Sequence, residues 1–132
     1  MVTVTLKNQV SVDKIEFAGD YLISGTVNGD PSWKKGEHAI WCNPHGYRYG
    51  NWKIGYWNKL GENDAEFTAS NDYEGLHNNL YLVTDNRLIW KYTRGTSPGK
   101  GWITSNYSPL PSKDVIISCS EGKESKCVHK TF

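Results

Sequence analysis

The segment from residue 42 to residue 51 concentrates side chains that suit ligand recognition. It reads Cys-Asn-Pro-His-Gly-Tyr-Arg-Tyr-Gly-Asn. Tyrosine rings supply flat, rigid contact area at low entropic cost, while arginine and asparagine supply directed hydrogen bonds. Rings flanked by such donors suit sugars, whose C–H faces stack on aromatic rings while their hydroxyls form the polar contacts. An alternative is that Tyr47 and Tyr49 fold back over the end of a β-barrel. We predict a ligand site formed by Tyr47, Arg48, Tyr49, Asn51, Trp57 and Trp33.

The two tryptophans are included because sequence patterns leave them outside the predicted core. Side chains alternate between the two faces of a strand, and a half-buried strand therefore alternates apolar and polar residues. In residues 51–57 this pattern places Trp52, Ile54 and Tyr56 on one face. Trp57 then shares the other face with Asn51 and Lys53 and is expected to be exposed. Trp33 follows a turn signal and is the second tryptophan expected at the surface.

The Cys42-Asn43-Pro44-His45 motif resembles the copper loop of blue-copper electron carriers, which also reads Cys-x-Pro-His in a β-sandwich. Such sites use two histidines, one cysteine and usually an axial methionine. Here the only methionine is Met1, and a glycine stands where the family's methionine commonly falls. A His38/Cys42/His45 site is geometrically conceivable. The departures favour a buried thiol followed by a turn with a surface histidine, and we predict no metal and no cofactor.

Catalytic motifs are weak in this sequence. It contains no Gly-x-Ser-x-Gly elbow, phosphate-binding glycine loop or paired His-Glu metal motif. Glu62, Asp64 and Glu66 cluster, but they lack the spacing of a calcium loop and predict a polar loop. We therefore favour a non-catalytic, lectin-like carbohydrate-binding module. Two alternatives remain open: a β-barrel that binds a small apolar molecule, and a hydrolase that uses His38 or His45 with an acidic partner.

The elements that position these residues read as strands throughout. No stretch of 11 or more residues has helical periodicity, and short β-branched or aromatic runs alternate with turn signals. The pattern predicts one all-β domain over residues 1–132, an antiparallel β-sandwich or flattened β-barrel of eight to eleven strands. The expected strands are Val2–Leu6, Val10–Phe17, Asp20–Val27, Glu37–Cys42, Asn51–Trp57, Ala65–Ala69, Asn79–Thr84, Arg87–Thr93, Gly101–Ser105, Asp114–Cys119 and Lys126–Thr131.

Two further patterns concern repetition. Ala39-Ile40-Trp41 precedes Trp52, and Leu88-Ile89-Trp90 precedes Trp102 at a similar spacing, so the chain has either two pseudo-repeats or a chance similarity. The residues Tyr21, Gly25, Asn28-Gly29, Pro31, Trp33, Trp41 and Trp52-Lys53-Ile54 form a second pattern. It resembles a small β-rich module repeated in some large eukaryotic extracellular proteins. The resemblance covers about a quarter of the chain; it implies a β fold and carries no known activity.

Composition excludes some partners and leaves the compartment open. The 132 residues include six tryptophans and carry a net charge of +1, which argues against nucleic acid or anionic lipid as the main partner. No apolar run approaches the length of a membrane span. The N-terminus lacks an apolar signal-peptide core, which slightly favours the cytoplasm over a mature secreted product. Three cysteines fit a disulfide framework poorly: Cys119 and Cys127 are one possible pair, and free thiols are favoured. Asn106 matches a glycosylation acceptor, a pattern that also arises by chance.

Overall fold

The protein is an all-β domain in which one nearly closed, barrel-like sheet surrounds the core. The computed structural model describes residues 1–7, 10, 12–27, 29–43, 52–70, 83–84, 89–93, 102–104 and 114–119. These residues form nine strands and two short 3₁₀ helices. The elements are β1 (Val2–Leu6), η1 (Val12–Phe17), β2 (Gly19–Val27), β3 (Asp30–Lys35), β4 (His38–Cys42), β5 (Trp52–Tyr56), η2 (Trp57–Lys59), β6 (Phe67–Ser70), β7 (Ile89–Thr93), β8 (Trp102–Thr104) and β9 (Val115–Cys119).

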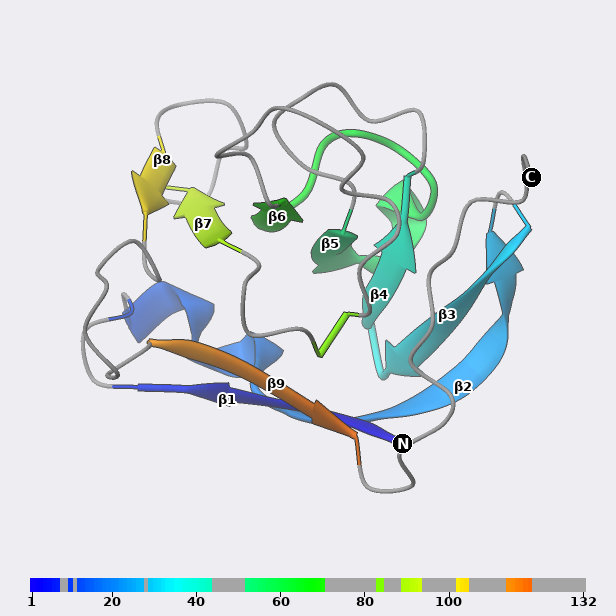
Figure 1. The fold of residues 1–132 in the computed structure, drawn as a ribbon, viewed down its shortest axis with the longest axis horizontal. Helices are drawn as coiled ribbons and strands as arrows, with labels where there is room; N and C mark the ends of the chain where they lie inside the picture. The colour runs from blue at the N-terminus through cyan, green and yellow to red at the C-terminus, as the bar shows by residue number, and fades with distance from the viewer. Residues whose placement is uncertain are drawn as a thin grey trace.

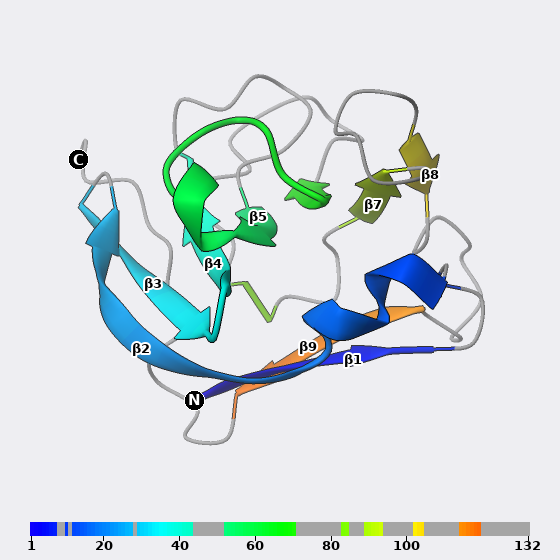
Figure 2. The ribbon, with the colours of Figure 1, turned by 180° about the vertical axis from the view of Figure 1, so that it is seen from behind.

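The sheet follows the chain as an antiparallel meander. The strand order is β8-β7-β6-β5-β4-β3-β2-β1-β9, so each strand from β1 to β8 pairs with the next, and β9 returns to pair with β1. Figures 1 and 2 show the strands curving around a common interior, with β1 and β9 on one side and β5 to β8 on the other. The helix η1 is nearer the viewer in Figure 2. It therefore lies at the end of the barrel that faces the viewer in that figure.

Two tight hairpins set the register of the strands around the predicted site. The pair Val27–Asp30 leaves a two-residue turn between β2 and β3, as the Asn28-Gly29 signal predicts. Gly29 has φ 84°, a value that glycine adopts without steric cost. The pair Lys35–His38 leaves a second two-residue turn between β3 and β4, where Gly36 has φ 60°. This short connection fixes which residues of β3 and β4 face the same way.

The main core lies inside the barrel and is rich in aromatic rings. Trp33, Trp52 and Trp90 are buried in it, and the Trp33 and Trp52 ring centroids are 6.0 Å apart. Such tilted aromatic pairs add to the stabilisation that comes from burial alone. The expected core position of Trp52 is confirmed, since this residue is fully buried. The other buried members include Val2, Val4, Phe17, Tyr21, Ile40, Ile54, Phe67, Tyr92, Val115 and Ile117.

A second, smaller cluster packs on the outside of β4 and β5. Trp41 is fully buried there with Ala39 and Ala65, although it faces away from the barrel interior. The covering segment is η2 and the residues after it, which fold back over the sheet and are held by a hydrogen bond from Trp41 Nε1 to the Glu62 carbonyl oxygen (3.1 Å). Gly55 permits this close approach, because a Cβ at that position would meet Trp41 at 3.1 Å.

Two sequence expectations about the elements are wrong, and the possible repeat, which the sequence left open, is not supported. Residues 12–17 of the expected strand Val10–Phe17 form η1 instead. The segment Asp30–Lys35, read as following a turn, is the strand β3 between β2 and β4. The two echoed triplets both lie in hairpins, but Trp41 faces the outer cluster and Trp90 the inner core. The echo therefore does not describe two equivalent structural repeats.

Neither of the helices in the described ranges has the length and apolar character that crossing a membrane would require.

Candidate functional site

A half-exposed tryptophan on the outer face of the sheet is the first candidate site. Trp57 opens η2, directly after β5, and packs on the outer cluster beside Val27 and Leu60. Its backbone N–H donates to the Glu37 carbonyl oxygen at 2.6 Å, which fixes the start of η2 against the turn between β3 and β4. The indole is therefore held at the surface by both packing and main-chain contact.

Lys34 completes this outer surface. Its ammonium nitrogen lies 4.3 Å from the Trp57 ring centroid, within the range of a cation–π contact. On the neighbouring strand, Leu22 is opposite Lys34 and 63% exposed. Trp57, Lys34 and Leu22, which we call the outer patch, thus combine an indole, a cation and an aliphatic side chain on one face.

The structure separates the two tryptophans of the predicted ligand site, the only members of that site among the described residues. Trp33 is buried in the barrel core, so the expectation that it is exposed is wrong: β3 pairs with β4, and Trp33 lies opposite the inward-facing Ile40. Tyr47, Arg48, Tyr49 and Asn51 lie outside the described residues, as does His45. Trp57 is half-buried. It follows Tyr56, the last residue of β5, whereas Asn51 precedes Trp52, the first residue of that strand.

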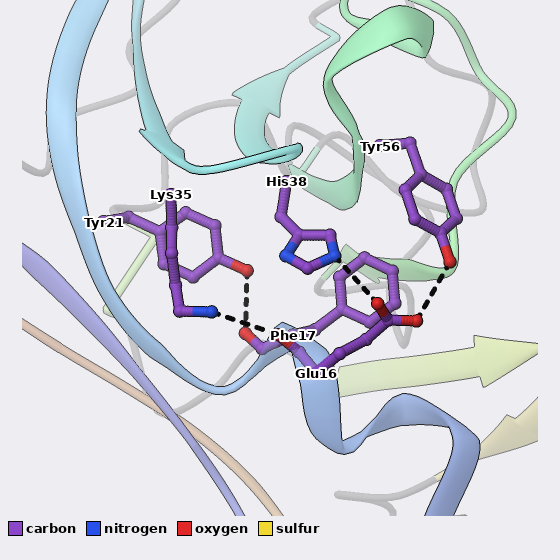
Figure 3. A network of polar contacts seen from close by, with 6 residues as sticks. All are labelled: Glu16, Phe17, Tyr21, Lys35, His38 and Tyr56. Atoms are coloured by element: carbon purple, nitrogen blue, oxygen red, sulfur yellow. Dashed lines mark hydrogen bonds and ion pairs between the residues drawn. The ribbon is translucent and has the colours of Figure 1, made fainter.

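A polar network at the η1 end of the barrel is the second candidate site (Figure 3). Glu16, in η1, accepts a hydrogen bond from the Tyr56 hydroxyl at Oε2 (3.1 Å), and its Oε1 lies 3.2 Å from His38 Nε2. The Lys35 ammonium donates to the Glu16 carbonyl oxygen, and the Tyr21 hydroxyl donates to the carbonyl oxygen of Phe17. These contacts join η1 to β2, to β5 and to the turn between β3 and β4, so the network closes one end of the barrel.

This network contains the histidine and carboxylate pair that a hydrolase would require. His38 is 8% exposed, its ring is 4.4 Å from that of Phe17, and its Nδ1 has no hydrogen-bond partner within the described part of the chain. Burial and the Glu16 contact raise the pKa of Tyr56 to about 12, so its hydroxyl stays protonated at neutral pH. No serine, threonine or cysteine of the described residues makes a recorded hydrogen bond to His38, so the arrangement lacks a nucleophile next to its base.

The Glu16 network is best explained as an anchor for η1, and it gives a testable consequence. Glu16→Gln keeps the size of the side chain but removes the negative charge that His38 and Tyr56 both contact. We expect a loss of about 0.5–2 kcal/mol in the free energy of unfolding, the range for a partly exposed hydrogen-bonded group. Urea unfolding measures it, with the exposed Glu37→Gln as the matched control. Equal stability of the two variants would contradict the anchor.

The acidic cluster predicted as a polar loop is divided between surface and interior. Glu62 and Asp64 are exposed, as predicted, whereas Glu66 is only 3% exposed. Burial raises the pKa of Glu66 above its usual value, and the positive charge of Lys14 partly opposes that effect. Among the residues that the structure describes, no three histidine, cysteine, aspartate or glutamate side chains are grouped as metal ligands.

Lys53 is the third candidate, since it is a lysine buried on the outer face of β5. It is 6% exposed, and its ammonium donates to Thr68 Oγ1 at 2.9 Å. Burial lowers the pKa of Lys53 to about 8, although the carboxylate of Asp64 acts in the opposite direction. Lysine is almost never fully buried unless it is paired, and no carboxylate of the described residues lies within 4.0 Å of this amine. Alternation correctly placed Lys53 on the same face as Trp57, but it did not predict that Lys53 is buried there.

Cys42 differs from the expected free thiols. Cys42, at the end of β4, is disulfide-bonded, so its sulfur is not available as a thiolate ligand. This removes the cysteine from the conceivable His38/Cys42/His45 site, and His38 itself contacts Glu16. Cys119 has the thiol that the sequence analysis favoured, and Cys127 lies outside the described residues.

Comparisons with protein-family models, with curated proteins and with solved structures find no match to this chain. The functional argument therefore rests on the chain's own residues. Sequence reasoning missed Glu16, Lys34 and Tyr56 as candidates. The partners of Glu16 are 22 and 40 residues away, so no local pattern signals them. Lys34 was missed because β3 was not predicted.

Proposed function

We propose that this protein is a non-catalytic binding module for carbohydrate, and that the outer patch forms part of its site. The observation that carries the proposal is the half-exposed Trp57 indole, fixed beside β5 with the Lys34 ammonium 4.3 Å from its ring centroid. Tryptophan has a large apolar ring with a polar N–H, and it is enriched where one side of a contact is apolar and the other wet. A sugar presents the same combination.

Lys34 supplies the polar part of the site and favours ligands that carry oxygen acceptors. Its ammonium lies over the Trp57 ring and can donate up to three hydrogen bonds. Hydroxyl groups accept such bonds, and a carboxylate or sulfate on an acidic sugar accepts them more strongly. Leu22, which is 63% exposed, extends the apolar surface by one strand.

The predicted loop residues Tyr47, Arg48, Tyr49 and Asn51 extend the same proposal. The segment that contains them joins β4 to β5 at the Cys42–Trp52 end, whereas Trp57 follows Tyr56 at the other end. Five residues of strand separate the two positions, which corresponds to roughly 16 Å. A ligand that reaches from Trp57 to the Trp52 end of β5 would be extended, as an oligosaccharide is.

The disulfide at Cys42 bears on the compartment in which the protein would encounter such a ligand. Disulfides persist in oxidising environments such as the cell exterior and are rare in the cytosol. This supports an oxidising compartment over the cytoplasm that the N-terminus slightly favoured. Extracellular glycans are then accessible partners, and the resemblance to an extracellular module agrees with this placement.

A glycan array followed by calorimetry tests the proposal. We expect an oligosaccharide to bind the parent protein and Trp57→Ala to weaken its affinity about tenfold or more, as truncation of a binding hot spot does. Val12→Ala is the control, because Val12 is 88% exposed and belongs to η1 rather than to the outer patch. Absence of binding to every glycan, or equal affinity of the Trp57→Ala and Val12→Ala variants, would refute the proposal.

One observation favours the alternative of a small apolar ligand inside the barrel. The Nε1 donor of Trp33 is buried in the core without a hydrogen-bond partner in the described ranges. Buried donors are rarely left unpaired, so an apolar ligand with one acceptor oxygen would satisfy it. Under this alternative Trp33 remains a ligand-binding residue, as predicted, but it acts from the interior.

A further inference from the structure

We propose that residues 23–27 of β2, which we call the open edge, pair with the same residues of a second copy of this chain to form a dimer. The strand β1 covers only the first part of β2, because their pairing ends at Val2 and Tyr21. Beyond that point β2 continues past the N-terminus to its hairpin with β3 (Figure 2). Among the residues that the structure describes, no strand pairs with the open edge on the side away from β3.

The main chain of the open edge determines that its partner is another strand. Neighbouring residues of a strand direct their N–H and C=O groups to opposite sides, so the open edge presents a row of these groups away from β3. An added strand forms hydrogen bonds along such a row, as when a sheet edge binds an extended peptide. Edge strands are commonly protected by charged side chains or proline. Residues 23–27 read Ile-Ser-Gly-Thr-Val and contain neither.

The side chains at the start of the open edge favour an apolar partner. Ile23 lies opposite the buried Trp33, on the interior face of the sheet, yet it is 56% exposed. Tyr21 is on the same face two residues earlier and is fully buried, where β1 still pairs with β2. Leu22, on the outer face between them, is 63% exposed. Burial along β2 therefore stops where its pairing with β1 stops.

A second copy fits the open edge because the edge is self-complementary. A β-bulge shifts the register of β2 between Ile23 and Gly25. As a result Ile23 and Thr26 share one face of the sheet, since their partners on β3, Trp33 and Pro31, are two residues apart. When two open edges run antiparallel about a two-fold axis, Ile23 of each copy lies opposite Thr26 of the other on a common face.

Charge does not oppose this pairing. The open edge is uncharged and the chain has a net charge of +1, so two copies meet with little repulsion. Pairing of two identical edges uses up both of them, so the assembly ends at a dimer. The paired segment is short and is twisted by its bulge, so we expect a reversible dimer with a dissociation constant of about 0.1–1 mM.

Sedimentation velocity at protein concentrations from about 10 µM to about 1 mM tests this proposal. We expect the parent to sediment as a 15.0 kDa monomer at the lowest concentration and increasingly as a dimer toward the highest. Ile23→Lys should weaken dimerisation at least about tenfold, because it places a charge within the pairing on both copies. Val12→Lys is the matched control, since Val12 is 88% exposed and belongs to η1. Circular dichroism of both variants at the lowest concentration checks that they are folded.

Two sedimentation results would overturn the proposal. One is a parent protein that stays monomeric at the highest concentration. The other is equal dimerisation of folded Ile23→Lys and Val12→Lys, which would place the interface elsewhere.

Amide hydrogen exchange of the parent locates the interface without any substitution. Amides of the open edge that face away from β3 gain a partner in the dimer, so we expect their exchange to slow at least about twofold between the lowest and highest concentrations. Amides of β4, which has a strand on each side, should not change. Slowing confined to β8 or β9 would contradict the proposal. Protection of the open edge that is already complete at the lowest concentration would also contradict it, because another segment of the same chain would then occupy the edge.

Discussion

Replacing Trp52 with alanine is expected to lower the free energy of unfolding by about 3–5 kcal/mol, the usual cost of removing a large ring from a core. Trp52 is fully buried, packs against Trp33, and lies opposite Ala69 on β6 and Cys42 on β4. Its loss leaves a cavity where these three strands meet. Urea unfolding monitored by circular dichroism measures the change.

A loss of this size approaches the whole stability of a typical domain, which is about 5–15 kcal/mol. Trp52→Phe therefore accompanies the alanine variant, because it keeps a ring in place and stays folded with a smaller loss. Trp57→Ala serves as the control, since Trp57 is half-exposed on the outer face. If Trp52→Ala unfolds at the same urea concentration as the parent, Trp52 does not belong to a buried aromatic core.

Replacing Lys53 with methionine is expected to stabilise the protein at neutral pH. Burial lowers the pKa of Lys53 from 10.5 to about 8, a difference that corresponds to about 3 kcal/mol. Methionine has a similar unbranched shape and carries no charge. Loss of the hydrogen bond to Thr68 offsets about 1 kcal/mol, which leaves a gain of about 2 kcal/mol. Lys59→Met, on the exposed face of η2, should change stability by less than about 0.5 kcal/mol.

The gain should depend on pH in a defined direction. Above pH 10.5 the amine is neutral in both the folded and the unfolded state, so burial of the charge costs nothing. Below about pH 8 it is protonated in both states, and the folded state bears the full cost. The advantage of Lys53→Met over the parent should therefore be largest at pH 7 and shrink at pH 10. A constant advantage, or a destabilised variant at pH 7, would show that Lys53 is not a buried charge.

The sequence predicted the fold where local signals agree with tertiary structure. Strands β1 and β5 alternate clearly, and Asn28-Gly29 marks its hairpin, so their positions follow from local preference. The strand β3 was missed because Asp30-Pro31 reads as part of a turn. Proline is tolerated there because the described pairing of β3 with β4 covers only Trp33 to Lys35.

The helix η1 was missed for a different reason. Its sequence, Val-Asp-Lys-Ile-Glu-Phe, mixes apolar and charged residues much as a half-buried strand does. In the structure Val12 and Ile15 are three residues apart and both exposed, whereas Lys14 and Phe17 are buried. Contacts of Glu16 with His38, and of Phe17 with His38 and Phe67, come from strands far along the chain, and no local preference encodes them.

The candidate site was predictable in orientation but not in exposure. Alternation correctly assigns Lys53 and Trp57 to the face opposite Trp52, because strand geometry fixes the side of each residue. Whether that face is wet depends on tertiary packing, which leaves Lys53 buried and Trp57 half-exposed. Such coverage is a tertiary property that depends on Gly55 and on the contact of Trp41 with Glu62.

The indole N–H spectrum of the protein during titration with the best-binding oligosaccharide tests the proposed function most directly. Each tryptophan gives one signal, and the environments of Trp57 on the outer patch and Trp33 in the core differ completely. The carbohydrate proposal predicts that the Trp57 signal shifts in a saturable manner while those of Trp33, Trp41 and Trp52 stay in place. A shift at Trp33 with Trp57 unmoved would contradict the outer patch and favour a ligand inside the barrel.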